Sequence, residues 1–280
     1  MDRIDFSKYK NINDAINHAN TLMLGDLQSK IHAHNLLSTA IYDLPNRYLD
    51  KTAHKIGLLR EKVWNIEKQF GWNPKFTSQS GQDKIIFDTF FKNRKSKGFF
   101  VDVGAYDGRL GSNSFFFEKF LNWQGIAFEP SKKQFLKLNQ IRNCICKNEA
   151  LGSVNTKVEF CDVVSGPTMM SGLKNAAFEK NLELINNVNE SKINTYELEV
   201  LSFKMGVGNN NMIDYLSIDI EGGEEDLIKS IDYNFYDIKV ISIENNYPTE
   251  INYNEYLSSK GFMFFNCYGH DEIYYNKNHF

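Results

Sequence analysis

The sequence predicts an α/β protein in which a doubly wound, Rossmann-like sheet follows an N-terminal helical extension. From residue 99 onward, short apolar runs alternate with stretches of helical periodicity, a pattern typical of a parallel sheet covered by helices on both faces. Between residues 10 and 70 the apolar residues recur only at helical spacing, and glycine and proline are nearly absent. These two observations divide the chain into two regions of different character.

The first region is expected to form two or three helices between residues 10 and 70. The sequence Gly71-Trp72-Asn73-Pro74 combines several helix breakers and marks the predicted boundary. We therefore expect a helical extension over residues 1–74 and a second domain over residues 75–280. The apolar stripes of the extension need burial, which a homodimer interface or a lid over a substrate site would supply.

The elements of the second region follow from its alternating pattern. Apolar runs that end in glycine or polar residues predict buried strands, and the periodic stretches between them predict helices. The predicted strands cover residues 99–103, 125–128, 144–150, 215–220 and 239–243. The predicted helices cover residues 114–121, 131–141 and 224–230, and the tail is expected to form a hairpin of residues 262–265 and 272–275.

The composition excludes several classes of protein. The formal net charge of -3 provides no overall basic face for phosphates, so we expect no nucleic-acid partner. The four cysteines match neither a zinc site nor a secreted disulfide framework. No apolar run approaches the roughly 20 residues that span a bilayer, and the start Met-Asp-Arg-Ile-Asp lacks the pattern of a signal peptide. We therefore expect a cytoplasmic protein without a membrane span.

Polar residues at the ends of the first two predicted strands indicate a nucleoside ligand. In an open α/β sheet the ligand lies beyond the carboxyl ends of the strands. Asp102, Gly104 and Gly108 follow the first strand, where the glycines let the backbone pass close to a ligand. Glu129 ends the next strand, where an acid can accept hydrogen bonds from both ribose hydroxyls. The G-x-G-x-x-G spacing of a nicotinamide dinucleotide site is missing, whereas S-adenosylmethionine has no phosphate and tolerates this loop.

Acidic residues end the next two predicted strands as well. Asp219 and Glu221 lie two residues apart, on the same side of an extended chain, and Glu244-Asn245 follows the neighbouring strand. Because adjacent strands lie about 5 Å apart, Asp219, Glu244 and Asn245 are candidate oxygen ligands of Mg²⁺ or Ca²⁺. Without a metal, Asp219 or Glu221 is the candidate general base, and Glu244 is a further catalytic candidate. The alternative for Asp219 and Glu221 is capping of the helix that follows.

Five motifs, in this order, resemble those of the FkbM family of methyltransferases. They are Ser78-Gln-Ser-Gly-Gln-Asp83, Val101-Asp-Val-Gly-Ala-Tyr-Asp-Gly108, Ser112-Asn113, Phe128-Glu-Pro130 and Ile218-Asp-Ile-Glu-Gly222. The resemblance covers residues 76–280 and leaves the helical extension outside. It implies the class I methyltransferase sheet and S-adenosyl-L-methionine as the cofactor.

The resemblance also implies roles for particular residues. It assigns the methionine part of the cofactor to Asp102, Gly104, Ala105 and Gly108. It assigns the ribose to Glu129 and the adenine to the neighbourhood of Asn148 and Glu149. The remaining expected cofactor contacts are Tyr106, Asn113, Pro130, Gln82 and Asp83. The chain departs from the usual motifs at Tyr106, where the broader methyltransferase loop has glycine, and at Gln82, where an acid is usual.

The resemblance further implies the kind of acceptor. The family often modifies sugars and glycans, so we expect O-methylation of a hydroxyl on a sugar, a glycan or a related small molecule. The acids that end the later strands are similar to the set that holds Mg²⁺ in catechol-type O-methyltransferases. Two alternatives stay open: N-methylation with the same cofactor, and a non-catalytic protein that binds an adenosine ligand or acts as a scaffold.

Overall fold

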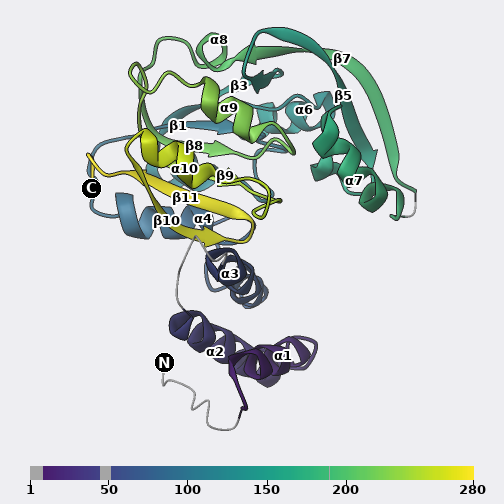
Figure 1. Ribbon diagram of the computed structural model, residues 1–280, viewed down its shortest axis with the longest axis vertical. Helices are drawn as coiled ribbons and strands as arrows, with labels where there is room; N and C mark the ends of the chain where they lie inside the picture. Colours follow the sequence, from purple (N-terminus) through teal and green to yellow (C-terminus); the bar gives the residue numbers. More distant parts are fainter. Residues whose placement is uncertain (1–8, 45–51, 189) are drawn as a thin grey trace.

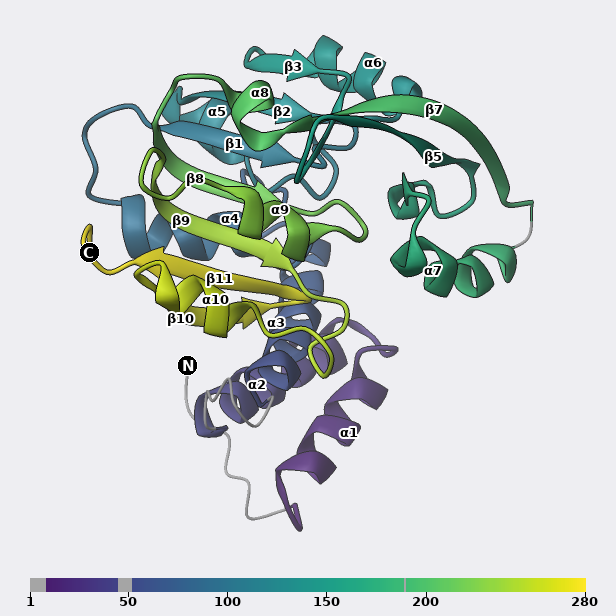
Figure 2. The ribbon, with the colours of Figure 1, turned by 45° about the horizontal axis from the view of Figure 1, so that its top comes forward.

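The structure, a computed structural model, describes residues 9–44, 52–188 and 190–280. It contains a seven-stranded sheet with helices on both faces, a smaller four-stranded sheet and a group of N-terminal helices (Figure 1). Figure 2 shows the N-terminal helices at the side of the main sheet where the C-terminal strands lie. Residues 1–8 and 45–51 of the predicted extension lie outside the described residues.

The main sheet has the strand order β3-β2-β1-β8-β9-β11-β10. Its strands are β1 (Phe99–Val103), β2 (Gln124–Phe128), β3 (Ile145–Lys147), β8 (Met212–Ile218), β9 (Asp237–Glu244), β10 (Phe262–Tyr268) and β11 (Asp271–Asn276). The strands from β3 to β9 are parallel, whereas β11 pairs antiparallel with both β9 and β10. The chain order reverses between β1 and β8, and in doubly wound sheets ligands bind at such a switch point.

Helices cover both faces of the main sheet. They are α4 (Gln82–Ile86), the π-helix η2 (Phe87–Phe91), α5 (Phe115–Leu121), α6 (Lys132–Ile141), α8 (Phe203–Val207), α9 (Glu224–Ser230) and α10 (Tyr253–Ser259). Because successive side chains of a strand point to opposite faces, Val101 and Val103 share a core with Leu227 of α9, while Phe100 shares another with Phe117 of α5. The predicted Rossmann-like fold is therefore confirmed.

The predicted elements of this sheet are confirmed with one exception. The single strand predicted over residues 144–150 is wrong, because the chain forms β3 there and then a separate strand β4 (Ala150–Gly152) in the second sheet. The residues between the two strands, Asn148 and Glu149, carry the chain from one sheet to the other. The polar residues Lys147, Asn148 and Glu149 interrupt the apolar run where the chain changes sheet.

The second sheet was not predicted. It has the order β4-β7-β5-β6, with β5 (Thr156–Ser165), β6 (Gly172–Leu173) and β7 (Lys192–Ser202). The short 3-10 helix η3 (Thr168–Met170) and helix α7 (Ala176–Asn186) lie in the same insertion, at the end of the long β5–β7 ribbon (Figure 2). Cys161 and Val163 of β5 pack against Phe178 and Ile185 of α7, which gives the insertion a small core of its own.

Three helices form the described part of the N-terminal extension, as predicted. They are α1 (Ile12–Leu22), α2 (Leu27–Asp43) and α3 (Thr52–Gln69). Asn11 and Asp26 cap α1 and α2 by accepting hydrogen bonds from the backbone N–H groups of Asp14 and Ser29. Within the described residues, none of the helices combines the length and the apolar content needed to cross a bilayer. The division of the chain at residue 74 stays a prediction.

Helix α3 packs directly against the end of the main sheet. The backbone N–H of Gly269, in the β10–β11 turn, donates to the carbonyl of Gly57 at 2.9 Å. Nη1 of Arg60 donates to the Cys267 carbonyl at 2.7 Å and to Oδ1 of Asn266 at 2.9 Å. A Cβ atom at position 57 would lie 2.5 Å from the Gly269 carbonyl oxygen, so only glycine permits this approach.

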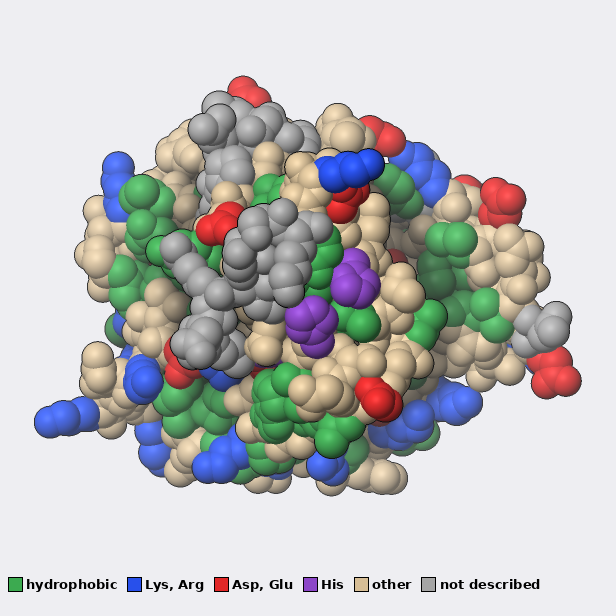
Figure 3. All heavy atoms as spheres, turned by 90° about the horizontal axis from the view of Figure 1, so that it is seen from below, with side chains coloured by type: hydrophobic (Ala, Val, Ile, Leu, Met, Phe, Trp, Pro, Cys, Tyr) green, Lys and Arg blue, Asp and Glu red, His purple; other side chains and the backbone are tan. Residues whose placement is uncertain are grey.

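Some large apolar side chains of the helical extension are exposed. Viewed from below, the hydrophobic side chains visible on this face of the molecule lie in several patches separated by polar and charged side chains (Figure 3). Leu24 and Leu27, in and after the α1–α2 turn, are 90% and 62% exposed. The predicted homodimer through these helices remains a proposal.

We expect Gly57→Ala to lower the free energy of unfolding by about 1–3 kcal/mol, because the new methyl group would separate α3 from the β10–β11 turn. Urea denaturation measures this change. Leu58→Ala is the control, because Leu58 is 41% exposed on the same helix, and its effect should stay within about 0.5 kcal/mol. A Gly57→Ala protein as stable as the parent would show that the close contact is not needed.

Candidate active site

The loop after β1 passes very close to the end of β8. Gly104 has φ +90°, and a Cβ atom there would lie 1.7 Å from the Asp219 carbonyl oxygen. Any side chain at this position would therefore displace the β8 end. The N–H groups of Gly104 and Ala105 both donate to the Phe128 carbonyl, at 3.0 and 2.9 Å, which fixes the loop to the end of β2.

Glu129 is buried at the end of β2 with both carboxylate oxygens partly engaged. One oxygen accepts from the Tyr106 N–H at 2.8 Å and the other from the Ser131 N–H at 2.7 Å. A carboxylate offers about four acceptor positions, so each oxygen keeps one for a further donor. Burial raises the pKa of Glu129 to about 8, more than its two backbone hydrogen bonds lower it.

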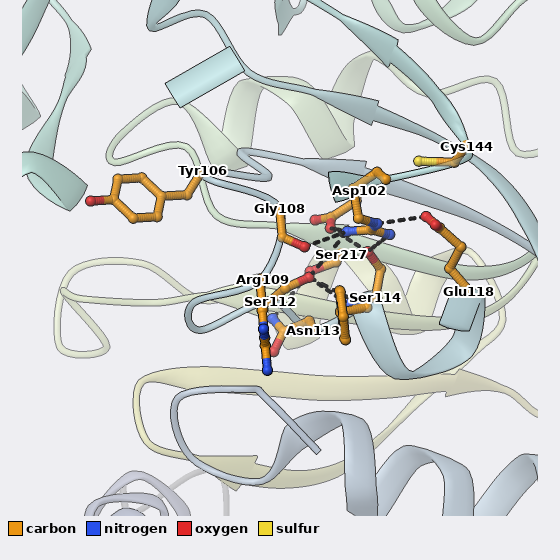
Figure 4. Close-up of polar contacts among 12 residues, drawn as sticks. Asp102, Tyr106, Gly108, Arg109, Ser112, Asn113, Ser114, Glu118, Cys144 and Ser217 are labelled. Atoms are coloured by element: carbon orange, nitrogen blue, oxygen red, sulfur yellow. Dashed lines mark hydrogen bonds and ion pairs between the residues drawn. The ribbon is translucent and has the colours of Figure 1, made fainter. Parts of the chain in front are cut away.

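Asp102 faces away from this region. Its carboxylate accepts from the Ser114 hydroxyl at 2.5 Å and lies 3.9 Å from Nη1 of Arg142. Nε of the same guanidinium donates to Glu118 at 2.5 Å, and Nη1 donates to the Gly108 carbonyl at 3.2 Å. Figure 4 shows Asp102, Ser114 and Glu118 turned towards a common centre, whereas Tyr106 points away from it.

The main cleft lies beyond the carboxyl ends of β1, β2 and β8. It encloses about 700 Å³ and is partly open to solvent. Seven predicted site residues line it: Gly104, Tyr106, Glu129, Pro130, Glu149, Asp219 and Glu221. One carboxylate oxygen of Glu149 is buried and has no hydrogen-bond partner among the described residues. The cleft therefore presents unused acceptor positions on Glu129 and Glu149.

Five residues predicted as cofactor contacts line neither the main cleft nor the small polar cavity beside it: Asp102, Ala105, Gly108, Asn148 and Asp83. The Asp102 carboxylate is held by Ser114 and Arg142 as described, and Ala105 packs against Leu138. The side-chain amide of Asn148 donates to the carbonyls of Glu129 and Pro130, at 2.8 and 3.1 Å, and so supports them.

The two remaining residues of this set have structural contacts of their own. Asp83 is completely buried and accepts hydrogen bonds from Thr77, Ser78 and Lys84 in the turn before α4. A Cβ atom on Gly108 would lie 2.8 Å from the Leu138 side chain. Both residues shape the loops around the cleft and provide no group that faces a ligand there.

A small polar cavity adjoins the main cleft. Gln82 and Asn113, both predicted, line it together with Asp219, Glu244, His270 and Asp271. The Asn113 amide donates to the Ser217 hydroxyl and to Asp271, but its Oδ1 atom is buried without a partner among the described residues. Gln79 and Asp219 line both cavities, so the two spaces are neighbours.

Three carboxylates gather where the cavities meet. Oxygens of Asp219, Glu221 and Glu244 all lie within 4.8 Å of one another. Glu221 has φ +57°, an uncommon conformation for a residue other than glycine. No described lysine or arginine forms an ion pair with any of the three. Burial raises the pKa of Glu221 to about 7, and burial together with the neighbouring acids raises the pKa values of Asp219 and Glu244 well above the usual range.

Asn245 does not join this group, although it was predicted as a metal ligand. Its side-chain amide donates to Glu272 at 2.7 Å and to the Ile251 carbonyl at 3.3 Å, while Oδ1 accepts from the Tyr247 N–H at 3.1 Å. These bonds engage both the N–H groups and the oxygen of the Asn245 side-chain amide. Glu221 provides the third oxygen donor of the group.

The sequence did not reveal the part of the main cleft that the insertion forms. Phe160, Thr168, Met169 and Leu173 come from β5, η3 and β6, and Gln79 comes from the loop before α4. The Tyr106 hydroxyl lies 2.6 Å from the Thr168 hydroxyl, which joins the insertion to the loop after β1. The turn-forming pair Gly166-Pro167 was the available signal, because it indicates that the chain reverses there.

The raised pKa of Glu129 predicts a loss of stability as the pH rises. The folded protein holds this proton up to about pH 8, whereas the unfolded chain releases it near pH 4.5. The stabilisation from the bound proton is therefore complete below pH 4.5 and is lost as the pH rises from there to about 8. We expect Glu129→Gln to remove on the order of 3 kcal/mol of the fall in unfolding free energy between pH 5.5 and 8.

Urea denaturation at several pH values measures this slope. The exposed Glu159 provides the control variant, Glu159→Gln, whose slope should match that of the parent. Equal slopes in the parent and the Glu129→Gln protein would show that Glu129 is ionised throughout this range.

A comparison with protein-family models identifies the family of the chain. The family model described as the methyltransferase FkbM domain matches residues 102–265, more than half of the chain. The crystal structure of a methyltransferase FkbM from Methylobacillus flagellatus KT is similar with a TM-score of 0.42 and 12% identity, over 85% of this chain and 57% of that one. A comparison with curated protein sequences finds no match. The matched residues include most of the parallel strands and the three carboxylates Asp219, Glu221 and Glu244. The match over more than half of the chain establishes that the chain belongs to the FkbM methyltransferase family.

Proposed function

We propose that the chain transfers a methyl group from S-adenosyl-L-methionine to a hydroxyl group of a sugar, a glycan or a related small molecule. Methyl transfer is the activity of its family. The observation that supports this cofactor is Glu129 at the edge of the main cleft beside the Gly104 loop, because its carboxylate in the ionised form keeps two acceptor positions. Two neighbouring ribose hydroxyls are donors that would fill both positions.

The other cavity residues fit the remaining parts of the cofactor. The unpartnered oxygen of Glu149 suits the amino group of adenine, which is a donor. The small polar cavity suits the charged end of methionine, because Asp271 accepts from an ammonium group and Gln82 and Asn113 carry amide groups. S-Adenosylmethionine supplies an electrophilic methyl carbon on a sulfonium and leaves as the neutral thioether S-adenosylhomocysteine.

The three carboxylates serve the acceptor. The acceptor oxygen must lose its proton as it bonds to the methyl carbon, and Glu221, with a pKa of about 7, is suited to receive it. Beyond this proton, alignment of the reacting atoms supplies most of the rate.

A divalent cation is the alternative use of the same carboxylates. Oxygens on one Mg²⁺ lie up to about 4 Å apart and those on one Ca²⁺ up to about 5 Å, so the observed group fits Ca²⁺ and needs small side-chain movements for Mg²⁺. A bound cation would orient the acceptor hydroxyl and lower its pKa.

We expect the purified protein to bind S-adenosylhomocysteine with a micromolar Kd in calorimetric titration. Glu129→Ala should weaken binding at least tenfold, since two hydrogen bonds to a buried carboxylate contribute about 1.5–3 kcal/mol each. NAD serves as the control ligand and Glu159→Ala as the control variant. Binding of NAD in place of S-adenosylhomocysteine, or equal affinity in the Glu129→Ala protein, would contradict the cofactor assignment.

We expect Glu244→Gln to weaken the binding of Mn²⁺ and Ca²⁺ at least tenfold, because it removes one of three charged donors. Electron paramagnetic resonance measures Mn²⁺ binding, and calorimetry measures Ca²⁺ binding. Glu255→Gln, in α10, is the control and should leave both affinities unchanged. Failure of the parent to bind either ion would reject the metal site and leave the general base.

Three further points of the proposal concern the whole chain. Product analysis distinguishes O-methylation from N-methylation, since both reactions use the same cleft. A protein that binds S-adenosylhomocysteine but keeps no activity would be the non-catalytic alternative. We also propose a homodimer through the helical extension, for which the exposed Leu24 and Leu27 provide apolar surface. A cytoplasmic location is the last part of the proposal.

A further inference from the structure

A third cavity, the acidic groove, reaches two of the three carboxylates, Glu221 and Glu244. It encloses about 930 Å³, including space open to solvent, and shares Glu221 and Glu244 with the other two cavities. None of the cofactor candidates at the ends of β1 and β2 lines it. The groove is therefore a separate route to the same reacting position.

The groove has two walls that come from distant parts of the chain. Helix α7 and the residue before it supply Asn175 and Asn181, and the segment after β9 supplies Asn246 and Tyr247. The Tyr247 hydroxyl donates to Oδ1 of Asn181 at 3.3 Å, and the Asn175 amide donates to the Gly222 carbonyl at 3.2 Å. These contacts join the insertion to the main sheet across the groove, so the groove does not depend on a single loop.

The groove is lined by acidic residues. Its five acids are Glu221, Glu224, Glu225, Asp226 and Glu244, and no lysine or arginine is among the described lining residues. Two cations nearby are already paired. Lys229 lies 2.7 Å from Glu225, and Lys180 lies 2.8 Å from Glu250 while it stacks on the Tyr247 ring.

The backbone of the groove offers no alternative site for an anion. The backbone N–H groups of the turn before α9 would be the natural donors to an anion. Those of Ile220 and Gly222 already donate to the Glu224 carboxylate, at 3.2 and 2.9 Å. Asp226 is exposed and has no cation partner among the described residues. A phosphate or carboxylate in the groove would therefore meet repulsion from the acids without a lysine or arginine among the described lining residues to offset it.

We propose that the acidic groove binds the methyl acceptor and selects carbohydrate acceptors that carry no negative charge, either neutral or bearing an amine. The inference rests on the proposed function and adds the class of acceptor to it. Asn175, Asn181 and Asn246 supply amide groups for hydroxyls, and Tyr247 supplies an aromatic ring for the apolar side of a sugar. A cation held by the three carboxylates would still leave Asp226, which has no cation partner among the described residues, in the lining of the groove.

The test measures transfer of a radiolabelled methyl group from S-adenosylmethionine to three pools of acceptors. The pools contain neutral sugars, amino sugars, and acidic sugars made up of uronic acids and sugar phosphates. Asp226→Lys reverses one charge of the groove, and Glu197→Lys reverses one exposed charge on β7 as a matched control. Binding of S-adenosylhomocysteine is measured for each protein.

We expect the neutral or amino pool to be labelled at least tenfold faster than the acidic pool. This ratio should fall severalfold in Asp226→Lys and stay unchanged in Glu197→Lys. Equal or faster labelling of the acidic pool, or an unchanged ratio in Asp226→Lys, would overturn the proposal. Labelling of no pool by a protein that binds S-adenosylhomocysteine would reject the carbohydrate class, whereas loss of that binding would reject the proposed function itself.

Discussion

The buried guanidinium of Arg142 is the interaction on which the rest of the site depends. Its side chain has no exposed surface and pairs with Glu118. Burial raises the pKa of Glu118, but Arg142 and the Asn143 N–H together lower it further, to about 2. It also contacts the Gly108 carbonyl and the Ser114 hydroxyl, at the middle and the end of the loop that begins at Gly104. A buried charge is stable only with its partners in place, so the loop keeps one shape although Arg142 itself lines no part of the main cleft.

Among the described residues, the acids at the ends of β8 and β9 lack a cationic partner such as Arg142 provides for Glu118. There, Asp219, Glu221 and Glu244 are close together without a described lysine or arginine partner, and their raised pKa values express the cost of ionising them. A positively charged ligand would lower that cost. The proposed cofactor, S-adenosyl-L-methionine, carries such a charge on its sulfonium and S-adenosylhomocysteine does not, so these carboxylates would favour the former over the latter.

The sequence predicted residues whose position follows from strand ends, and it failed where the position depends on distant partners. Glu129, Asp219 and Glu244 each end a parallel strand, and parallel strands bring their carboxyl ends to one edge. Asp102 also lies at a strand end, but Ser114 and Arg142, the residue after α6, engage its carboxylate, and Asp102 does not line the main cleft. Asn245 was expected to face the site, yet Glu272 of the C-terminal hairpin holds its amide. The insertion that forms β5, β6 and α7 has no alternation of helix and strand that would reveal a second sheet.

The contact between α3 and β10 has a further consequence for the behaviour of the protein in solution. Strand β10 is the last strand of the main sheet, and such strands offer unpaired backbone groups to other molecules. Arg60 takes up the Cys267 carbonyl, and Gly57 brings the α3 backbone against the β10–β11 turn. The helix thus protects this edge strand from pairing with another molecule, together with the irregularity in β10 between Phe264 and Asn266.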